Sequence, residues 1–351
     1  MSFVSQLPNP ASFDEACAAR ACAYQDQLTK PVGSLGRLES LAAFYAGVRG
    51  EFPVATPKRA FLTVFAADHG VTAEGVSAFP AHLTTPITQN VVDGGAGICV
   101  LARQFDVELL VVDVGMTGDL ATSSRSRVPA LSAKIRRGTR NFRIEDAMTE
   151  DEAAAALRLG VEIAEARAKT GIDVVGIGEV GIGNTTAAAA LIAAYTGKPV
   201  NQVTGRGTGI SDNALAGKIQ VIEQALARIN GRRDPFEIAR AVGGLEILAM
   251  AGFVLGAASH RIPVVIDGVV AAAAALVAHA LRPTVAQCCM ASHRSVEPGI
   301  DAALLHLGQK PLFDLGMRLG EGTGAVIAIG LLRAAVAVSN EMATFESAGL
   351  T

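Results

Sequence analysis

Four apolar runs constrain the fold of this chain more than any other feature of its sequence. Each run is rich in Val, Ile, Leu or Ala, and each is followed by a polar or glycine-containing turn and then by a helix pattern. The runs are Ala60–Ala67, Val107–Val114, Ile172–Ile177 and Ile262–Ile266. Strands of a parallel sheet appear as near-continuous apolar runs because helices cover both of their faces. The alternation of strands and helices therefore predicts an α/β fold, a Rossmann-like doubly wound parallel sheet.

Segments outside the four runs extend this prediction. Ser12 and Glu15 fit a capping box, which predicts a helix from Phe13 to Leu28. The segment Val285–Ala291 is predicted as a fifth strand, and a last helix pattern runs from about Thr323 to Met342.

The two ends of the chain carry helix patterns only. Because the termini of a domain often lie close together, we expect both ends to join in a small helical subdomain beside an α/β nucleotide-binding and catalytic domain. The expected boundaries are residues 1–55 and 330–351 for the helical subdomain and residues 56–329 for the α/β domain.

Composition and charge argue against several function classes. The net charge is -3 and the chain has no long basic block, so nucleic-acid binding is not expected. The longest apolar stretches are interrupted by Asp267 and Arg333, and the N-terminus lacks a basic start followed by an apolar segment, so neither a membrane span nor a secretory signal is expected. Five cysteines without metal-like spacing and six scattered histidines indicate a cytoplasmic protein with reduced thiols and no metal site.

The glycine loop Gly176–Thr186 follows the third run and precedes an Ala-rich helix. It matches the pattern GxGxxG, but the acidic residue that binds the ribose in a dinucleotide site, about 20 residues further on, is missing. What remains is a helix N-terminus that can hold an anion. Glu179 lies inside this loop, where an acid would repel a phosphate, so its carboxylate would suit a sugar hydroxyl instead.

Three further features each allow two interpretations. A second glycine loop, Thr204–Asp212, precedes a helix that carries Lys218, whose amine could contact a phosphate or solvent. Asp68 and His69 end the first run and could form a site edge or satisfy the amides of a turn. The basic segment Lys134–Asn141 could face an anion, although a solvated loop is commoner.

Glu321 lies between Gly320 and Gly322 at the start of the last helix pattern. The two glycines let the backbone turn freely, and a helix N-terminus favours an anion nearby. The carboxylate is therefore either a poised base or an ordinary acid of a first helical turn, which by itself is the commoner case.

Polar residues at several strand ends predict one site, because ligands of doubly wound sheets bind at the carboxyl ends of the strands. The chain has neither a GxSxG elbow nor a GxxxxGK[ST] loop. Carboxylates together with anion-binding glycine loops indicate a phosphorylated sugar or nucleotide as substrate and a general base as catalyst.

A series of segments resembles, in order, the signatures of one protein family. The segments are LTKPVGSLGRLE, ADHGV, EGVSAFP, GGAGICVLAR, VVDVGM, RRGTRNF, GIGEVGIGNTTAAAA, GRGTGISD, GGLEI and PLFDLGMRLGEGTGA. They extend from about Asp26 to Phe345. Over this length the chain is similar to the nicotinate-nucleotide–dimethylbenzimidazole phosphoribosyltransferases of the lower-ligand branch of cobalamin synthesis.

The resemblance implies a reaction and the residues that serve it. The family transfers the 5-phosphoribosyl group of nicotinate mononucleotide to 5,6-dimethylbenzimidazole, giving α-ribazole 5′-phosphate and nicotinate. The resemblance implies that Glu321 is the base and that Glu179 lies near the ribose or the charge developing at its anomeric carbon. The positions implied near the phosphate are Gly181, Gly183, Asn184, Thr185 and Lys218. The positions implied in the base pocket are Ser77 and Leu319.

The resemblance also implies a homodimer with small-molecule substrates and without cofactor or metal. One segment, His82–Thr88, departs from the family, which usually carries Gln and Met there. The acceptor therefore stays open between dimethylbenzimidazole, another azole and a purine. A non-catalytic nucleotide-binding protein is a further alternative, and the presence of both Glu179 and Glu321 argues against it.

Overall fold

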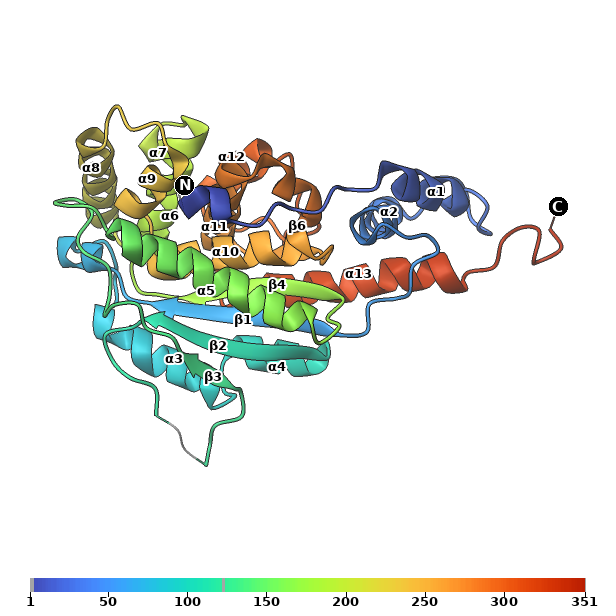
Figure 1. The fold of residues 1–351 in the computed structure, drawn as a ribbon, viewed down its shortest axis with the longest axis horizontal. Helices are drawn as coiled ribbons and strands as arrows, with labels where there is room; N and C mark the ends of the chain where they lie inside the picture. Colours follow the sequence, from blue (N-terminus) through green and yellow to red (C-terminus); the bar gives the residue numbers. More distant parts are fainter. Residues whose placement is uncertain (1–2, 122–123, 351) are drawn as a thin grey trace.

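The sheet of the computed structural model, which describes residues 3–121 and 124–350, is parallel throughout. Within these residues it has six strands in the order β3-β2-β1-β4-β5-β6 (Figure 1). This is the strand order of the dinucleotide-binding doubly wound fold, so the predicted fold class is confirmed. The strands are β1 (Ala60–Ala67), β2 (Val107–Gly115), β3 (Ala130–Ser132), β4 (Val174–Val180), β5 (Val264–Ile266) and β6 (Cys289–Ala291).

The strands predicted from the sequence agree with the structure to different degrees. The bounds of β1 are those predicted, and all eight of its residues are buried. Strand β4 continues beyond Ile177 to Val180, so Glu179 belongs to the strand rather than to a loop. In the predicted fifth strand, Val285–Ala291, the first four residues belong to the 3₁₀ helix Pro283–Cys288 and only the last three pair with β5. The short edge strand β3 was missed because its residues are exposed and show no apolar pattern.

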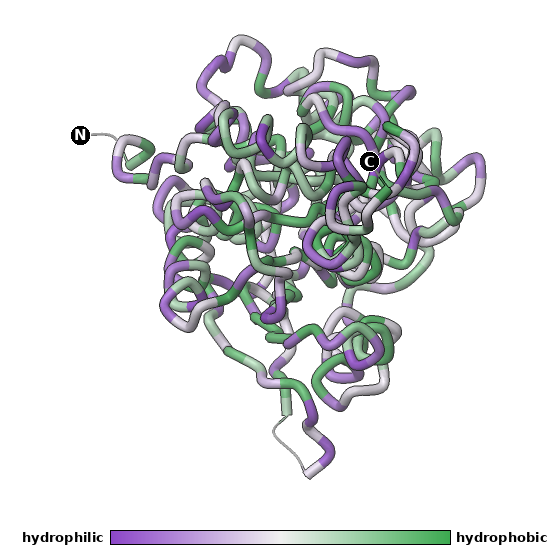
Figure 2. The backbone as a smooth tube through the Cα atoms, turned by 90° about the vertical axis from the view of Figure 1, so that its right-hand side faces the viewer, coloured by the Kyte–Doolittle hydropathy of each residue, from purple (hydrophilic) through white to green (hydrophobic). Residues whose placement is uncertain are grey.

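Helices cover both faces of the sheet and enclose two apolar cores (Figure 1). Successive side chains of β1 point to opposite faces. Phe61 and Phe65 therefore enter one core, whereas Leu62 and Val64 enter the other. Figure 2 shows hydrophobic segments gathered toward the middle of the molecule and hydrophilic ones in the outer loops.

The first core is formed with helices that lie mostly in the second half of the chain. They are α5 (Glu150–Ala168), α6 (Asn184–Thr196), α7 (Val200–Val203), α8 (Asp212–Arg228), α9 (Pro235–Val242), α10 (Leu245–Ser259), α11 (Val269–Leu281) and α12 (Gly299–His306). The second core is formed with α1 (Glu15–Gln25), α2 (Arg37–Arg49), α4 (Gly97–Gln104) and α13 (Thr323–Glu341), and α3 (Thr84–Val92) lies on the same side of the sheet. Four 3₁₀ segments complete the described structure, namely Phe3–Gln6, Gly70–Glu74, Ala81–Leu83 and Pro283–Cys288.

The N- and C-terminal segments lie side by side. Leu28 and Thr344 form an antiparallel bridge, and α13 packs against α2 and α1. The first helix begins at Glu15 rather than at Phe13, because Asp14 and not Ser12 caps it by accepting the N–H of Cys17. The division into a helical subdomain (1–55, 330–351) and an α/β domain (56–329) stays a prediction.

Among the described helices, α13 is the one long and apolar enough to cross a membrane, with a mean hydropathy of 1.5. Over half of that stretch is buried inside the protein, and Arg333 within it donates hydrogen bonds to four backbone carbonyls. Helix α13 is thus a core helix of this fold.

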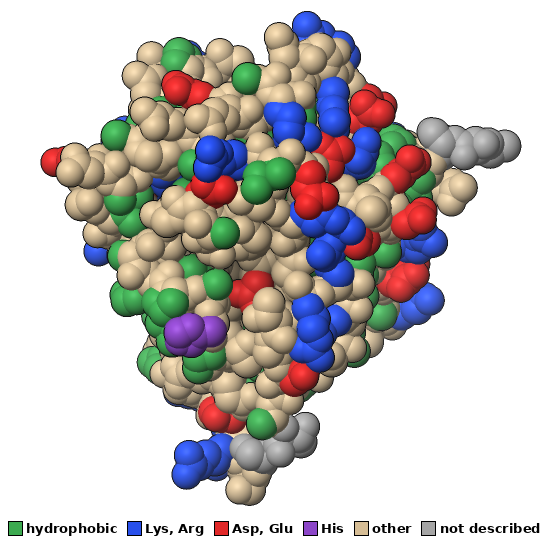
Figure 3. Space-filling view, turned by 90° about the vertical axis from the view of Figure 1, so that its left-hand side faces the viewer, with side chains coloured by type: hydrophobic (Ala, Val, Ile, Leu, Met, Phe, Trp, Pro, Cys, Tyr) green, Lys and Arg blue, Asp and Glu red, His purple; other side chains and the backbone are tan. Residues whose placement is uncertain are grey.

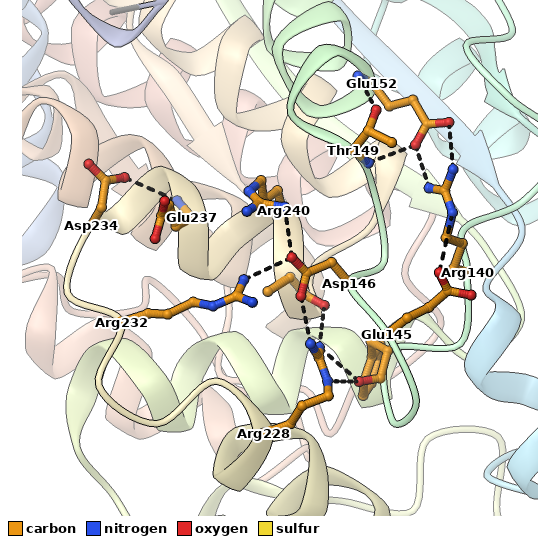
Figure 4. A network of polar contacts seen from close by, with 12 residues as sticks. Arg140, Glu145, Asp146, Thr149, Glu152, Arg228, Arg232, Asp234, Glu237 and Arg240 are labelled. Atoms are coloured by element: carbon orange, nitrogen blue, oxygen red, sulfur yellow. Dashed lines mark hydrogen bonds and ion pairs between the residues drawn. The ribbon is translucent and has the colours of Figure 1, made fainter.

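A partly buried acid joins the loop before α5 to helices α8 and α9. Asp146 accepts hydrogen bonds from Arg228 (2.6 Å), Arg232 (2.9 Å) and Arg240 (2.7 Å), as Figure 4 shows. Burial alone would raise the pKa of Asp146, but Arg232 and Arg228 lower it below its usual range. This cluster ties the outer helices of the first face together.

Helices α5 and α10 cross in direct backbone contact. A Cβ added at Gly160 would overlap the carbonyl oxygen of Ala249, and one added at Gly252 would overlap that of Leu157. Glycine is required at both crossing points because no side chain fits between the two helices.

We expect Gly252→Ala to lower the free energy of unfolding by about 1–3 kcal/mol or more, since overpacked cores relax only partly. Gly217→Ala is the matched control, because a Cβ at this position of α8 meets no atom within 4 Å. That control is expected to stabilise the helix by up to about 1 kcal/mol. Urea unfolding of both variants checks this, and equal midpoints for the two would contradict the close contact.

Candidate active site

A cavity of about 600 Å³ opens at the carboxyl ends of the strands. Its walls come from loops that are far apart in the sequence. The lining includes Val76, Ser77 and Phe79 after β1, Glu179 to Thr185 at the end of β4, Gly207 and Thr208, Gly268 to Val270 after β5, His293, Ser295 and Glu297 after β6, and Arg318 to Glu321 before α13. Figure 3 shows the face at these strand ends, where charged side chains of both signs gather on one side and the other side is largely uncharged.

One end of the cavity is formed by the N-terminus of α6. Gly183 caps this helix with a left-handed backbone (φ 92°), and Gly181, Asn184 and Thr185 line the cavity beside it. The N–H groups of Asn184 and Thr186 donate to the carbonyl oxygens of Gly181 (3.1 Å) and Gly183 (3.0 Å), so the helix dipole and the N–H of Thr185 are what this N-terminus offers to an anion. The anion-binding helix N-terminus that the sequence predicts therefore forms part of the cavity wall.

Lys218 lies directly behind this wall and does not line the cavity itself. Its Nζ donates hydrogen bonds to Thr185 Oγ1 (2.9 Å) and to the carbonyl oxygen of Gly205 (3.1 Å). Burial lowers the pKa of Lys218 to about 8, although the carboxylate of Glu297 opposes that shift. The amine is thus hydrogen-bonded to Thr185 and places a positive charge close to the anion-binding helix N-terminus.

The second glycine loop, Thr204–Asp212, is fixed by three hydrogen bonds that the sequence did not reveal. The N–H of Gly207 donates to Glu297 Oε1 (2.8 Å). Thr208 Oγ1 lies 3.1 Å from Ser77 Oγ and accepts the N–H of Ala78 (2.9 Å). These contacts join Ser77, which lines the cavity, to the second glycine loop.

Glu179 projects from the end of β4 into the cavity. The amide of Asn184 donates a hydrogen bond to one of its carboxylate oxygens. Burial raises the pKa of Glu179 well above its ordinary value, and the nearby carboxylates of Glu246, Asp267 and Glu321 raise it further. Glu179 is therefore a destabilised carboxylate that a cationic ligand would relieve.

Glu321 is not a first-turn acid of α13. It lies just before the N-cap residue Gly322 and has a left-handed backbone (φ 62°) between two left-handed glycines. Its Oε2 accepts the N–H of Ile98 at 3.2 Å, and burial raises its pKa despite that hydrogen bond. The carboxylate therefore lines the cavity and accepts an N–H from the first turn of α4 instead of capping α13.

The turn that carries Glu321 packs directly on strand β4. A Cβ added at Gly178 would overlap the carbonyl group of Glu321, and one added at Gly320 would lie 2.6 Å from Glu179 Oε1. Glycine at these two positions lets the two carboxylates share one cavity.

Apolar side chains form a large part of the cavity lining. Val76, Phe79, Ile87, Val180 and Leu319 contribute to it, and Phe79 and Leu319 are at least half exposed. From the segment that departs from the family pattern, Ile87 lines the cavity. Such a surface suits one face of an aromatic heterocycle.

Asp68 and His69 lie outside the cavity lining. Asp68 Oδ2 accepts the N–H and the hydroxyl of Thr117, at 2.7 and 2.8 Å. His69 Nε2 pairs with Glu246 Oε1 at 2.7 Å in full burial. Burial alone would lower the pKa of His69, but the attraction of Glu246 outweighs it and raises the pKa. The interpretation of Asp68 as a residue that satisfies turn amides is the one the structure supports.

The basic segment Lys134–Asn141 is likewise engaged elsewhere. Lys134 pairs with Asp113, Arg137 with Asp119, and Arg140 with Glu152. None of the segment's residues lines the described cavity. In residues 3–121 and 124–350, no group of three His, Cys, Asp or Glu side chains is placed to hold a metal ion.

Sequence reasoning missed Glu297, Thr208, Arg318 and Ile87 as cavity residues. Glu297 follows the predicted strand Val285–Ala291, and this position of a carboxylate after a strand end was the available signal. No pattern in the sequence could show that Glu297 meets Gly207, because the two residues are 90 positions apart.

Comparisons with known proteins agree with this geometry. A family model described as "Phosphoribosyltransferase" matches residues 11–350. The nicotinate-nucleotide–dimethylbenzimidazole phosphoribosyltransferase of Geobacter metallireducens is 49% identical over 347 residues, which cover 98% of this chain and 96% of that protein. The protein of the same name from Chloroflexus aggregans is 48% identical over 353 residues, covering 100% and 99%. The crystal structure of CobT from Thermus thermophilus superposes with a TM-score of 0.90 at 42% identity, covering 96% and 99%.

Because the pKa of Glu179 is raised, the stability of the protein should depend on the ionisation of this side chain. A carboxylate whose folded pKa exceeds its unfolded value of 4.5 destabilises the protein increasingly as the pH rises above that value. We expect Glu179→Gln to be more stable than the wild type at pH 8, and this advantage to vanish as the pH falls to about 4.5.

Glu152→Gln is the control, because the pKa of Glu152 is shifted in the opposite direction from that of Glu179. Burial alone would raise the pKa of Glu152, but Arg140 and the N–H of Thr149 lower it below 4.5. This variant should be less stable than the wild type at neutral pH, with the difference lost in acid. Thermal melts of both variants and the wild type between pH 4 and 8 measure these differences in stability. A pH-independent effect of Glu179→Gln would contradict the raised pKa of Glu179.

Proposed function

Because this chain belongs to the nicotinate-nucleotide–dimethylbenzimidazole phosphoribosyltransferase family, we infer that it transfers the 5-phosphoribosyl group of nicotinate mononucleotide to 5,6-dimethylbenzimidazole. The products are α-ribazole 5′-phosphate, which serves the nucleotide loop of cobalamin, and nicotinate. The observation that carries the residue assignments is that a buried carboxylate with a raised pKa, Glu321, shares one cavity with an anion-binding helix N-terminus and an apolar surface.

The 5′-phosphate binds at the N-terminus of α6. Gly181, Gly183, Asn184 and Thr185 supply the polar groups that face it, and Lys218 adds a positive charge through Thr185. The dimethylbenzimidazole ring lies on the apolar surface near Ser77 and Leu319. This placement leaves the ribose between the two ends, beside Glu179.

The reaction replaces one bond to the anomeric carbon by another. The bond between this carbon and the pyridinium nitrogen breaks, and its electron pair stays with nicotinate. One nitrogen of the azole attacks the same carbon from the opposite face, which inverts its configuration, while Glu321 takes the proton from the other nitrogen. The leaving ring needs no acid because it is already cationic while attached.

The carboxylates of the cavity stabilise the positive charge that develops on the ribose. Glu179 is held close to that position by Asn184, and Glu321 lines the same cavity. Preorganised charges in a buried site act more strongly than the same charges in water. A cationic transition state also offsets the repulsion between the buried carboxylates.

We further propose that the protein is a cytoplasmic homodimer. Val296, Leu315 and Leu319 are more than half exposed, and the N–H of Val296 donates to Met317 O (3.3 Å), so this apolar surface borders the cavity. All five cysteines are free thiols, which fits a reducing compartment. Light scattering on the purified protein measures the oligomeric state, and a monomer at micromolar concentration would contradict the dimer.

We expect Glu321→Ala to reduce turnover by about 10²–10⁴-fold, because general-base assistance is typically worth that much. Binding of nicotinate mononucleotide should survive, since the phosphate end is untouched. Release of nicotinate in the presence of dimethylbenzimidazole is the assay, and Glu341→Ala at the exposed end of α13 is the control. Near-normal turnover of Glu321→Ala would refute the base assignment.

A second candidate function is transfer to a different azole or to a purine, which the apolar Ile87 in the departing segment His82–Thr88 motivates. We expect dimethylbenzimidazole to give the highest kcat/KM in a panel of azoles and purines. A purine that reacts faster would favour the second candidate. Absence of nicotinate release with every acceptor would indicate a binding protein instead.

A further inference from the structure

Asp267 occupies the N-terminus of helix α13 from outside that helix. It follows strand β5 directly, and its carboxylate is almost fully buried. Oδ1 accepts the N–H groups of Gly324 (2.7 Å) and Ala325 (3.1 Å), and Oδ2 accepts that of Gly322 (3.1 Å). The unpaired N–H groups that begin a helix are thus used by one remote side chain.

Because Asp267 accepts these N–H groups, the neighbouring carboxylate of Glu321 does not cap α13. A carboxylate next to a helix N-terminus is normally drawn to the first N–H groups and is acidified by the helix dipole. Here the carboxylate of Glu321 turns away from α13 and accepts the N–H of Ile98, the second residue of α4, which by itself would lower the pKa. Burial then dominates, and the pKa of Glu321 lies above its ordinary value.

The backbone of the turn needs such support. Gly320, Glu321 and Gly322 are all left-handed, with φ of 81°, 62° and 91°. A left-handed conformation is unfavourable for a non-glycine residue, so it persists where the surroundings fix it. Two contacts do so at this turn, namely the close packing on Gly178 and the hydrogen bond from the Gly322 N–H to Asp267.

We propose that Asp267 is a positioning residue for the transfer reaction, whose carboxylate holds the Gly320–Gly322 turn and occupies the α13 N-terminus so that Glu321 faces the cavity as the base. The inference rests on the proposed role of Glu321. It assigns to Asp267 no contact with substrate, because the hydrogen bonds to α13 engage both of its oxygens.

Several titratable groups face these two carboxylates. His293 Nδ1 lies 3.9 Å from Asp267 Oδ1, and Glu179 on β4 interacts with both Asp267 and Glu321. On α4, Cys99 senses the charge of Glu321. Burial raises the pKa of Asp267 to about 7, although the N–H groups of Ala325, Gly322 and Gly324 oppose the shift.

The test compares Asp267→Asn with Asp113→Asn in the full-length protein. Asp113 is the matched control, because it is also a buried strand-end acid that accepts a backbone N–H, from Met116 at 2.9 Å, and it does not line the cavity. For Asp267→Asn we expect kcat to fall by on the order of 10²-fold, the effect of a misplaced catalytic group, with an unchanged KM for nicotinate mononucleotide. For Asp113→Asn we expect lower thermal stability with an unchanged pH profile.

The pH profile of kcat separates positioning from a merely structural role. Once the negative charge of Asp267 is removed, the uncompensated helix end stabilises ionised Glu321, so the acid limb should move to lower pH. A loss of kcat that only follows the loss of folded protein, with the acid limb in place, would overturn the proposal. Asp267→Ser, which keeps an oxygen acceptor without the charge, provides the same measurement where the asparagine variant does not fold.

A double-mutant cycle with Glu321→Ala distinguishes failure of this inference from failure of the base assignment. If Asp267 acts through Glu321, Asp267→Asn should reduce kcat no further in the Glu321→Ala background. Independent, multiplicative losses would overturn the positioning role while leaving Glu321 as the base. Full turnover of Glu321→Ala alone would remove the premise, and Asp267 would then have no base to position.

Discussion

The close packing of the Gly320–Gly322 turn on strand β4 is the constraint on which the rest of the cavity depends. Because Gly178 has no side chain, the peptide after Glu321 lies directly against the strand that carries Glu179. Two carboxylates that are far apart in the sequence thereby reach one space at the carboxyl edge of the sheet. Asp267, at the end of the next strand, fixes the same turn from the other side. The doubly wound topology makes this possible, since β4 and β5 are neighbours in a parallel sheet.

The cavity combines groups of opposite electrostatic character. The N-terminus of α6 and the amine of Lys218 provide positive potential for an anion. Beside them, Glu179, which is partly buried and accepts a hydrogen bond from Asn184, and the buried Glu321 both have raised pKa values and favour a developing cation. A ribose that carries a phosphate at one end and a cationic centre at the other matches this polarity. The buried carboxylates cost folding stability above their unfolded pKa, which is the usual relation between a preorganised polar site and the fold that holds it.

Long-range hydrogen bonds complete the cavity from loops that share no local pattern. Glu297 holds Gly207, and Thr208 joins Ser77, so the segments after β1 and β6 meet at the second glycine loop. The histidine and arginines that looked available in the sequence are used elsewhere. His69 is paired with Glu246 in the interior, and the basic segment Lys134–Asn141 is neutralised by acids on neighbouring elements.

The sequence alone determined the fold class, because short apolar runs that alternate with helix patterns are typical of strands in a parallel sheet covered on both faces. Through its motifs it also marked Glu321, Glu179 and the residues from Gly181 to Thr185, which all line the cavity. It could not show that Glu321 stands outside helix α13, since a left-handed backbone is stabilised by contacts with residues far away in the chain. Nor could it decide the direction of the pKa shift of Glu321, which depends on two distant facts. Asp267 takes the N-terminus of α13, and burial against α4 then raises the pKa of the carboxylate that remains.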